Sequence, residues 1–126
     1  MEKEIIATNN APAALGPYSQ AVCAGNMVFL SGQLGIDPAT GELGVDVVEQ
    51  AHQAMKNILA VLKEKNATAD NIVKTTIFLS DLGNFATVND IYKTYFTGSF
   101  PARSCVEIAA LPKNAAVEIE AIAYLG

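Results

Sequence analysis

Two segments with the composition of β-strands are apolar on both of their faces. Residues 27–30 and 72–79 carry apolar side chains at odd and at even positions, whereas a strand with one face in water alternates. Only two segments have the periodicity of an amphipathic helix, and two helices cover one face of a sheet of five or six strands. Something else must bury the other face, and a second copy of the chain is the simplest candidate. The pattern therefore predicts a homo-oligomer.

The clearest local signal is a helix that begins after Asp46. Asp46 and Glu49 have the spacing of a capping box, apolar residues then recur at helical spacing as far as Leu62, and Asn66 can end the helix. A second amphipathic helix is expected over residues 85–96. Strands are expected at residues 4–8, 21–24, 27–32, 72–80, 104–110 and 117–125. Unevenly interleaved strands and helices favour an α+β fold, here as a single domain over residues 1–126.

The charge and composition argue against several kinds of partner. The chain has 13 acidic and 8 basic residues, a net charge of −5 and no basic cluster, unlike proteins that bind nucleic acids. No apolar run approaches the ~20 residues that cross a bilayer, and the first residues lack the features of a secretion signal. Two cysteines and one histidine do not make a tetrahedral metal site. We expect a cytoplasmic protein with no membrane, nucleic-acid or metal partner.

Arg103 is the first candidate for a functional residue. It closely follows Pro101 at the start of an apolar strand, where the fixed backbone of the proline presents it stiffly. A guanidinium held in this way can bind a carboxylate through two parallel hydrogen bonds. A structural ion pair with Glu107 or Glu120 is an equally good interpretation from the residues alone.

Two carboxylates share one face of the last expected strand. Glu118 and Glu120 alternate with apolar residues, so their side chains point the same way. The strand is either a solvated edge strand, or one acid accepts a hydrogen bond from a water molecule held opposite Arg103.

Four further polar or small residues are weaker candidates. Asn89 borders the apolar stripe of the second expected helix, where its amide needs partners; it caps a neighbouring loop or lines a pocket. Tyr18 lies in the long loop before residue 21, and Ser31 and Gly32 lie at a strand end. Such placements are compatible with the walls of a pocket but are also common in turns.

A nucleophilic cysteine is not expected. Cys105 shares a strand face with Arg103, whose charge could lower the pKa of the thiol. The only histidine, His52, is instead expected to be a partly buried structural residue of the first helix. The chain therefore lacks the base that a Cys–His pair requires.

Five blocks of sequence, in order along nearly the whole chain, resemble the reactive-intermediate deaminase (Rid) family in its RidA subgroup. They are NAPAALGPYSQ at 10–20, FLSGQ at 29–33, VKTTIFL at 73–79, FPARS at 100–104 and VEIEA at 117–121. The resemblance implies a chorismate-mutase-like α+β fold, with two helices on one face of a mixed, mostly antiparallel sheet. It also implies a homotrimer with its pockets between subunits.

The resemblance further implies an activity and a site. Family members hydrolyse enamines and imines, typically 2-aminoacrylate and 2-iminobutanoate, to 2-keto acids and ammonia, without a metal or organic cofactor. This chain would then be a 2-iminobutanoate/2-iminopropanoate deaminase, in which Arg103 binds the substrate carboxylate and Glu118 holds the attacking water. The substrate-binding residues implied are Tyr18, Ser31, Gly32, Asn89 and Cys105, the last through its backbone N–H. The alternative is a non-catalytic module of the same fold that binds a small anion such as a keto acid.

The sequence departs from the family pattern before Phe100. Residues 97–99 form a shorter segment than in many relatives. The departure concerns the rim of the implied pocket and therefore the size of substrate it admits.

Overall fold

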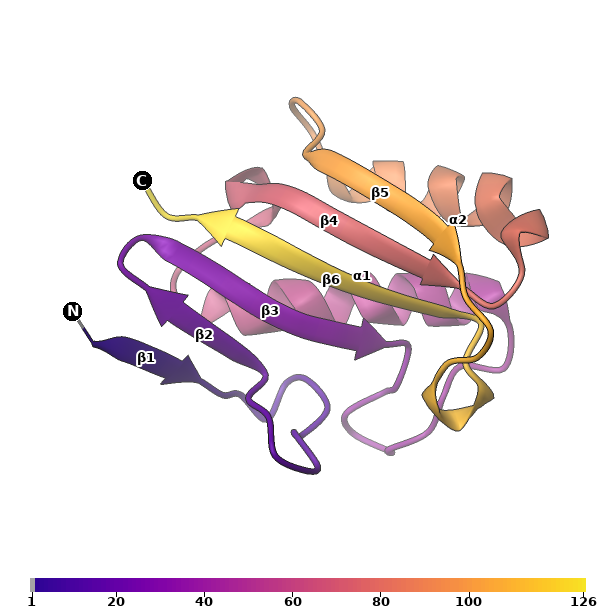
Figure 1. Ribbon diagram of the computed structural model, residues 1–126, viewed down its shortest axis with the longest axis horizontal. Helices are drawn as coiled ribbons and strands as arrows, with labels where there is room; N and C mark the ends of the chain where they lie inside the picture. Colours follow the sequence, from indigo (N-terminus) through magenta and orange to yellow (C-terminus); the bar gives the residue numbers. More distant parts are fainter. Residues whose placement is uncertain (1) are drawn as a thin grey trace.

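The computed structural model describes residues 2–126; Met1, where the expected domain begins, lies outside them. Six strands form a sheet in the order β1-β2-β3-β6-β4-β5, and both helices pack on one face of it, behind the sheet in Figure 1. The bounds are β1 Lys3–Ile6, β2 Ala21–Ala24, β3 Met27–Leu34, α1 Val47–Lys63, β4 Ile72–Leu79, α2 Phe85–Tyr92, β5 Ala102–Glu107 and β6 Val117–Tyr124.

The sheet is mixed and mostly antiparallel. Four of its five strand pairings are antiparallel, and the edge strand β5 runs parallel to β4. The predicted α+β fold, with two helices on one face of such a sheet, is confirmed. Several bounds differ from expectation. Helix α2 ends at Tyr92 and continues only as a 3-10 turn, β5 runs from Ala102 to Glu107, β1 ends at Ile6, and β3 continues to Leu34.

Helix α1 begins and ends at its predicted signals. The side chain of Asp46 accepts a hydrogen bond from the N–H of Glu49 at 2.9 Å. The second half of the capping box is displaced by one residue, because Glu49 accepts from the N–H of Val45 instead of that of Asp46. Asn66 adopts a left-handed backbone, with φ of 55°, and so ends the helical region as expected.

The core lies between the sheet and the helices. Alternate residues of β6 are buried there: Val117, Ile119, Ala121 and Ala123. The opposite face of the sheet has no helix over it, and apolar side chains lie side by side across its strands. We call this row the open-face patch: Ile5, Val22, Phe29 and Ile122, in cross-strand register. Phe29 is 47% exposed in the single chain.

None of the helices in the described part of the chain combines the length and apolar character that crossing a membrane requires.

Candidate active site

The seven predicted site residues separate into two groups on opposite sides of the sheet. One group lines a pocket on the uncovered side: Tyr18, Ser31, Gly32 and Glu118. The other group lies on the helix side: Asn89, Arg103 and Cys105. In β5, Arg103 is paired with the buried Thr75, whereas Glu118 alternates in β6 with residues that face the core. A single chain therefore does not bring Arg103 and Glu118 together.

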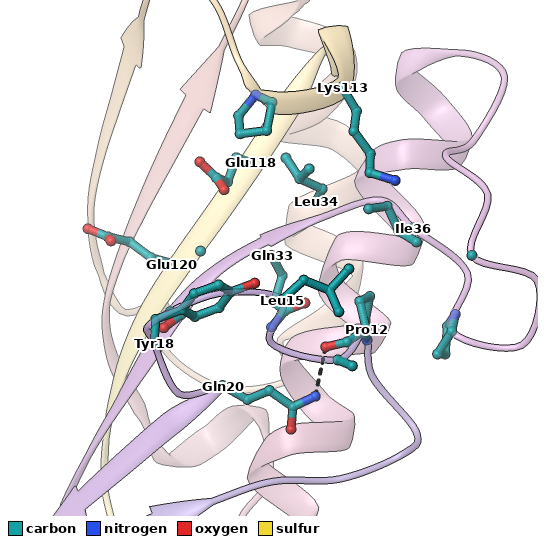
Figure 2. A pocket seen from close by; sticks show the side chains of 16 residues that line it. Pro12, Leu15, Tyr18, Gln20, Gln33, Leu34, Ile36, Lys113, Glu118 and Glu120 are labelled. Atoms are coloured by element: carbon teal, nitrogen blue, oxygen red, sulfur yellow. Dashed lines mark hydrogen bonds between the residues drawn. The ribbon is translucent and has the colours of Figure 1, made fainter.

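The uncovered side of the sheet carries a pocket, which we call the β3–β6 pocket. It is lined by the loop before β2, by β3 and the loop after it, by the turn Pro112–Asn114 and by β6, and its volume is about 830 Å³ (Figure 2). Its apolar lining includes Pro12, Leu15, Leu34, Ile36 and Pro38. Glu118 and Glu120 supply carboxylates, and Lys113 supplies an ammonium group. The pocket thus combines a mostly apolar wall with a few charged groups.

Gly32 makes room for the carboxylate of Glu118. The register of β3 against β6 shifts between Leu30 and Gln33, so Gly32 lies in an irregularity within the strand and not at its end. A Cβ atom on Gly32 would lie 2.8 Å from Cδ of Glu118 and 2.9 Å from its Oε2. A side chain at position 32 would therefore displace the carboxylate.

Burial raises the pKa of Glu118, and the neighbouring charge of Glu120 raises it further. Both effects disfavour the ionised form, so Glu118 keeps its proton to higher pH than an ordinary glutamate. The interpretation of β6 as a solvated edge strand is wrong, because β6 lies between β3 and β4. A partly buried carboxylate with a raised pKa on a central strand suits general acid–base chemistry.

Gln20, which the sequence analysis passed over, fixes the loop that carries Tyr18. Its buried amide accepts from the N–H of Thr8 at 2.7 Å and donates to the carbonyl of Pro12 at 2.7 Å. Ser31 adds a second tie, since its hydroxyl donates to the carbonyl of Ser19 at 2.6 Å. The Ser31 hydroxyl is therefore engaged by the loop, while Tyr18 is left 54% exposed at the pocket.

Arg103 is held by an amide and two aromatic rings. Its Nη1 donates to Oδ1 of Asn89 at 2.6 Å. Its guanidinium carbon lies 5.5 Å from the ring centroid of Phe85 and 5.2 Å from that of Tyr92, within cation–π range. The hydroxyl of Tyr92 lies 2.7 Å from Oγ1 of the buried Thr75, which fixes that ring. Arg103 is thus oriented before any ligand arrives.

The sequence allowed a structural ion pair for Arg103 and a loop cap for Asn89, and the structure shows neither in the part of the chain that it describes. Arg103 forms no ion pair within residues 2–126: Glu107 accepts from the N–H of Leu82, and Glu120 lies on the other side of the sheet. Asn89 caps no loop and does not line the β3–β6 pocket; it binds Arg103. Phe85 and Tyr92, which also hold Arg103, are not among the site residues that the sequence predicts. Their spacing from Asn89, four and three residues, could have indicated one shared helix face.

The charge of Arg103 does act to lower the pKa of the Cys105 thiol, but the net shift is upward. Burial raises the pKa of this thiol, and the charge of Arg103 opposes that effect only in part. His52 is a structural residue, as predicted, with its Nδ1 2.7 Å from the hydroxyl of Tyr95. Across residues 2–126, no three side chains of His, Cys, Asp or Glu gather in a way that could hold a metal ion.

Comparison with known proteins gives extensive matches. A family model described as endoribonuclease L-PSP matches residues 8–125. A Mus musculus protein named 2-iminobutanoate/2-iminopropanoate deaminase is 52% identical over 98% of this chain and 93% of its own length. Relatives from Bos taurus and Escherichia coli carry the same name.

Two crystal structures share the fold over almost their full lengths. A protein of unknown function of the Rid family from Yersinia pestis has a TM-score of 0.95 and 54% identity, covering 98% of this chain and 99% of that one. Escherichia coli TdcF with bound serine has a TM-score of 0.95 and 44% identity, with coverage of 98% and 99%. The chain therefore belongs to the family that the matching model describes as endoribonuclease L-PSP, the Rid family that its five sequence blocks resemble.

Proposed function

We propose that the protein is an enamine/imine deaminase that hydrolyses 2-aminoacrylate and 2-iminobutanoate-type intermediates to 2-keto acids and ammonia. The names of its curated relatives support this activity. The proposal depends mainly on two functional groups that the fold holds in position, the guanidinium of Arg103 and the carboxylate of Glu118. Arg103 is oriented by Asn89 and two rings to bind an anion, and Glu118 is partly buried with a raised pKa at an apolar pocket.

The two groups act together only if two chains meet. We propose a homotrimer of chorismate-mutase-like subunits in which Arg103 of one subunit faces Glu118 of the next. The placement of these residues on opposite sides of the sheet supports a site shared between subunits. Arg103 lies on the edge strand β5, where a neighbouring subunit can reach it. The open-face patch of Ile5, Val22, Phe29 and Ile122 gives the neighbour an apolar surface to cover.

The proposed reaction needs a positioned water molecule and no strong nucleophile. Arg103 binds the substrate carboxylate through two parallel hydrogen bonds, and the backbone N–H groups of Gly32 and Cys105 complete its surroundings. Glu118 orients the water and accepts its proton as the oxygen bonds to the electrophilic carbon of the C=N group, which gives a carbinolamine. The protonated Glu118 delivers this proton to the nitrogen of the carbinolamine. The C–N bond then breaks, its electron pair leaves with nitrogen as ammonia, the oxygen forms the C=O bond of the 2-keto acid, and the hydroxyl proton passes back to Glu118.

The substrate we propose is a small imino acid and not a nucleic acid. The matching family model is described as an endoribonuclease, but the chain carries a net charge of −5 and no basic cluster. Binding to a phosphate backbone depends on concentrated lysine and arginine. RNA binding that weakens steeply with salt would contradict this part of the proposal.

Coupling the purified protein to a threonine dehydratase tests the activity, with formation of the keto acid as the readout. We expect acceleration by the wild type. Arg103→Lys keeps the charge but loses the paired hydrogen bonds, so its kcat/KM should fall roughly tenfold to a hundredfold. Lys93→Ala, on the exposed Lys93–Asp90 pair, is the matched control and should keep full activity.

Arg103 is the only arginine of the chain, so phenylglyoxal, which modifies arginine, reports on a single site. A 2-keto acid should protect it from modification. Saturable keto-acid binding without turnover would favour the non-catalytic alternative, and full activity of Arg103→Ala would contradict the proposed mechanism.

A further inference from the structure

Helix α1 carries two buried amide side chains that the proposed mechanism does not use. Asn57 is fully buried, and its Nδ2 donates to the carbonyls of Leu34 at 3.1 Å and Ile36 at 2.9 Å. Gln50 is 6% exposed; its Nε2 donates to the carbonyl of Gly44 at 3.0 Å, and its Oε1 accepts from the N–H of Ala116 at 2.7 Å. Both amides form these hydrogen bonds with main-chain groups that lie outside α1.

The main-chain groups that they bind lie in, or next to, segments that line the β3–β6 pocket. Leu34 and Ile36 line the pocket directly. Ala116 lies just before β6, two residues ahead of Glu118. Gln50 therefore ties the loop that follows β3 to the beginning of the strand that carries the carboxylate.

The loop has little freedom to move toward α1. A Cβ atom on Gly35 would lie 2.3 Å from Cα of Gln50, so the backbone of the loop already rests on the helix. The N–H of Gly44 donates to the carbonyl of Gly35 at 3.0 Å, which closes the loop on itself. The two amides thus act as spacers of fixed length between α1 and residues 34–44.

Leu34 and Ile36, whose carbonyls are bound by Asn57, form a wall that extends along the pocket from Glu118. Leu34 is the cross-strand partner of Glu118, and Ile36 follows it along the pocket (Figure 2). If the reacting carbon lies at Glu118, the side chain of the substrate lies against Leu34 and Ile36. The distance between this wall and the carboxylate then limits how long that side chain can be.

We propose that Gln50 and Asn57 are positioning residues that set the distance between Glu118 and the loop wall at Ile36, beyond the end of β3, and thereby the length of the substrate side chain. The inference rests on the proposed function, because it places the reacting carbon at Glu118. It makes specificity depend on two side chains that do not touch the substrate.

Gln50→Glu is the sharpest variant, since glutamate has nearly the same size and still accepts from Ala116 but cannot donate to Gly44 as a carboxylate. 2-Iminobutanoate and 2-iminohexanoate, generated by an amino-acid oxidase, are the paired substrates. Because the loop cannot move toward α1, losing the bond to Gly44 frees it to move away from the helix, so we expect the ratio of kcat/KM for the longer over the shorter imine to change by about fourfold, the factor that one buried methylene contributes. Asn57→Ala should shift the ratio in the same direction.

Asn71→Asp is the matched control, because Asn71 donates to the carbonyl of Tyr124 at the far end of β6, away from the pocket. Its ratio should equal that of the wild type. Thermal denaturation of each variant shows which ones are folded at the assay temperature. If Asn57→Ala does not fold, Gln50→Glu decides alone. An equal loss of kcat/KM for both imines, with an unchanged ratio, would overturn the inference and leave the proposed function intact.

A binding measurement separates the two proposals. The affinities of wild type and Gln50→Glu for 2-oxobutanoate and 2-oxohexanoate are compared by calorimetry, which requires no turnover. A wild type without deaminase activity would overturn the proposed function, and the ratio of the two affinities would then decide the inference. A wild type that neither forms nor binds a keto acid would overturn both.

Discussion

The surroundings of Glu118 raise its pKa in two ways. Burial is the larger cause of its raised pKa and the charge of Glu120 the smaller. In the proposed mechanism Glu118 is the base that accepts a proton from water, and it must be ionised to do so. Its activity should therefore be lost as the pH falls through a pKa that lies above the ordinary value for glutamate.

Glu120→Gln removes the smaller of the two causes. The pKa of Glu118 should fall, so the acidic limb of kcat/KM should move to lower pH while remaining above its ordinary position because burial is unchanged. A pH–rate profile between about pH 4 and pH 8 measures the shift. A limb that stays in place, or moves to higher pH, would contradict this account of Glu118.

Gly32→Ala tests the space reserved for the same carboxylate. The new Cβ would lie 2.8 Å from Cδ of Glu118, and displacing the carboxylate should lower kcat/KM roughly tenfold to a hundredfold, as small misplacements of reacting groups do. Lys93→Ala, on the exposed Lys93–Asp90 pair, is the control and should keep full activity. Equal activity of the two variants would show that Gly32 is not needed for this geometry.

At the scale of single residues, the sequence pointed to Arg103 and Glu118 but could not choose between their interpretations. An ion pair of Arg103 with Glu120 depends on which faces of two different strands they occupy, and that is a matter of register between strands distant in sequence. The net pKa of Cys105 depends on burial opposing a neighbouring charge, and only coordinates show which is larger. The roles of the seven site residues stay predictions until the variants are measured.

One face of helix α2 contacts the guanidinium of Arg103. Phe85, Asn89 and Tyr92 all contact the guanidinium, and Tyr92 is anchored through its hydroxyl to Thr75. The helix therefore both packs on the sheet and orients the cation.

Two substitutions on α2 should separate these tasks. Tyr92→Phe keeps the ring but leaves Thr75 without its partner, so the free energy of unfolding should fall by about 1–3 kcal/mol with activity retained. Phe85→Ala removes a half-exposed ring from Arg103, so kcat/KM should fall about threefold while stability changes little. Urea denaturation and steady-state kinetics measure both effects. The reverse pattern would contradict the assignment of tasks.

Helices and strands that are marked by a local sequence pattern could be predicted. The order of the strands in the sheet could be predicted less well. The start and end of α1 are encoded within a few residues of Asp46 and Asn66, and the structure confirms them. The position of β6 in the middle of the sheet is set by pairings with β3 and β4, which no local pattern encodes. For the same reason, the sequence predicts a strand end at Ser31 and Gly32, where the structure has an irregularity within β3.

The whole molecule has one covered and one uncovered sheet face, as counting apolar faces and helices predicted. Phe29 and Ile122 lie next to each other on the uncovered face, and Glu118 and Glu120 share that face with them. The homotrimer, the cytoplasmic location and the absence of a nucleic-acid partner stay predictions. Under the proposed mechanism, the separation of Arg103 from Glu118 requires an oligomer for the reaction, because each chain then carries two half-sites.

Mixing two inactive variants tests this claim most directly. Arg103→Ala and Glu118→Gln are unfolded together in equal amounts and refolded, and the deaminase activity of the mixture is compared with that of each variant refolded alone. In a ring of randomly mixed chains, each site takes its arginine from one subunit and its carboxylate from the next, so about a quarter of the sites should regain both groups. We expect about that fraction of wild-type activity from the mixture and almost none from either variant alone. A mixture as inactive as its components would show that the two groups do not meet across a subunit boundary.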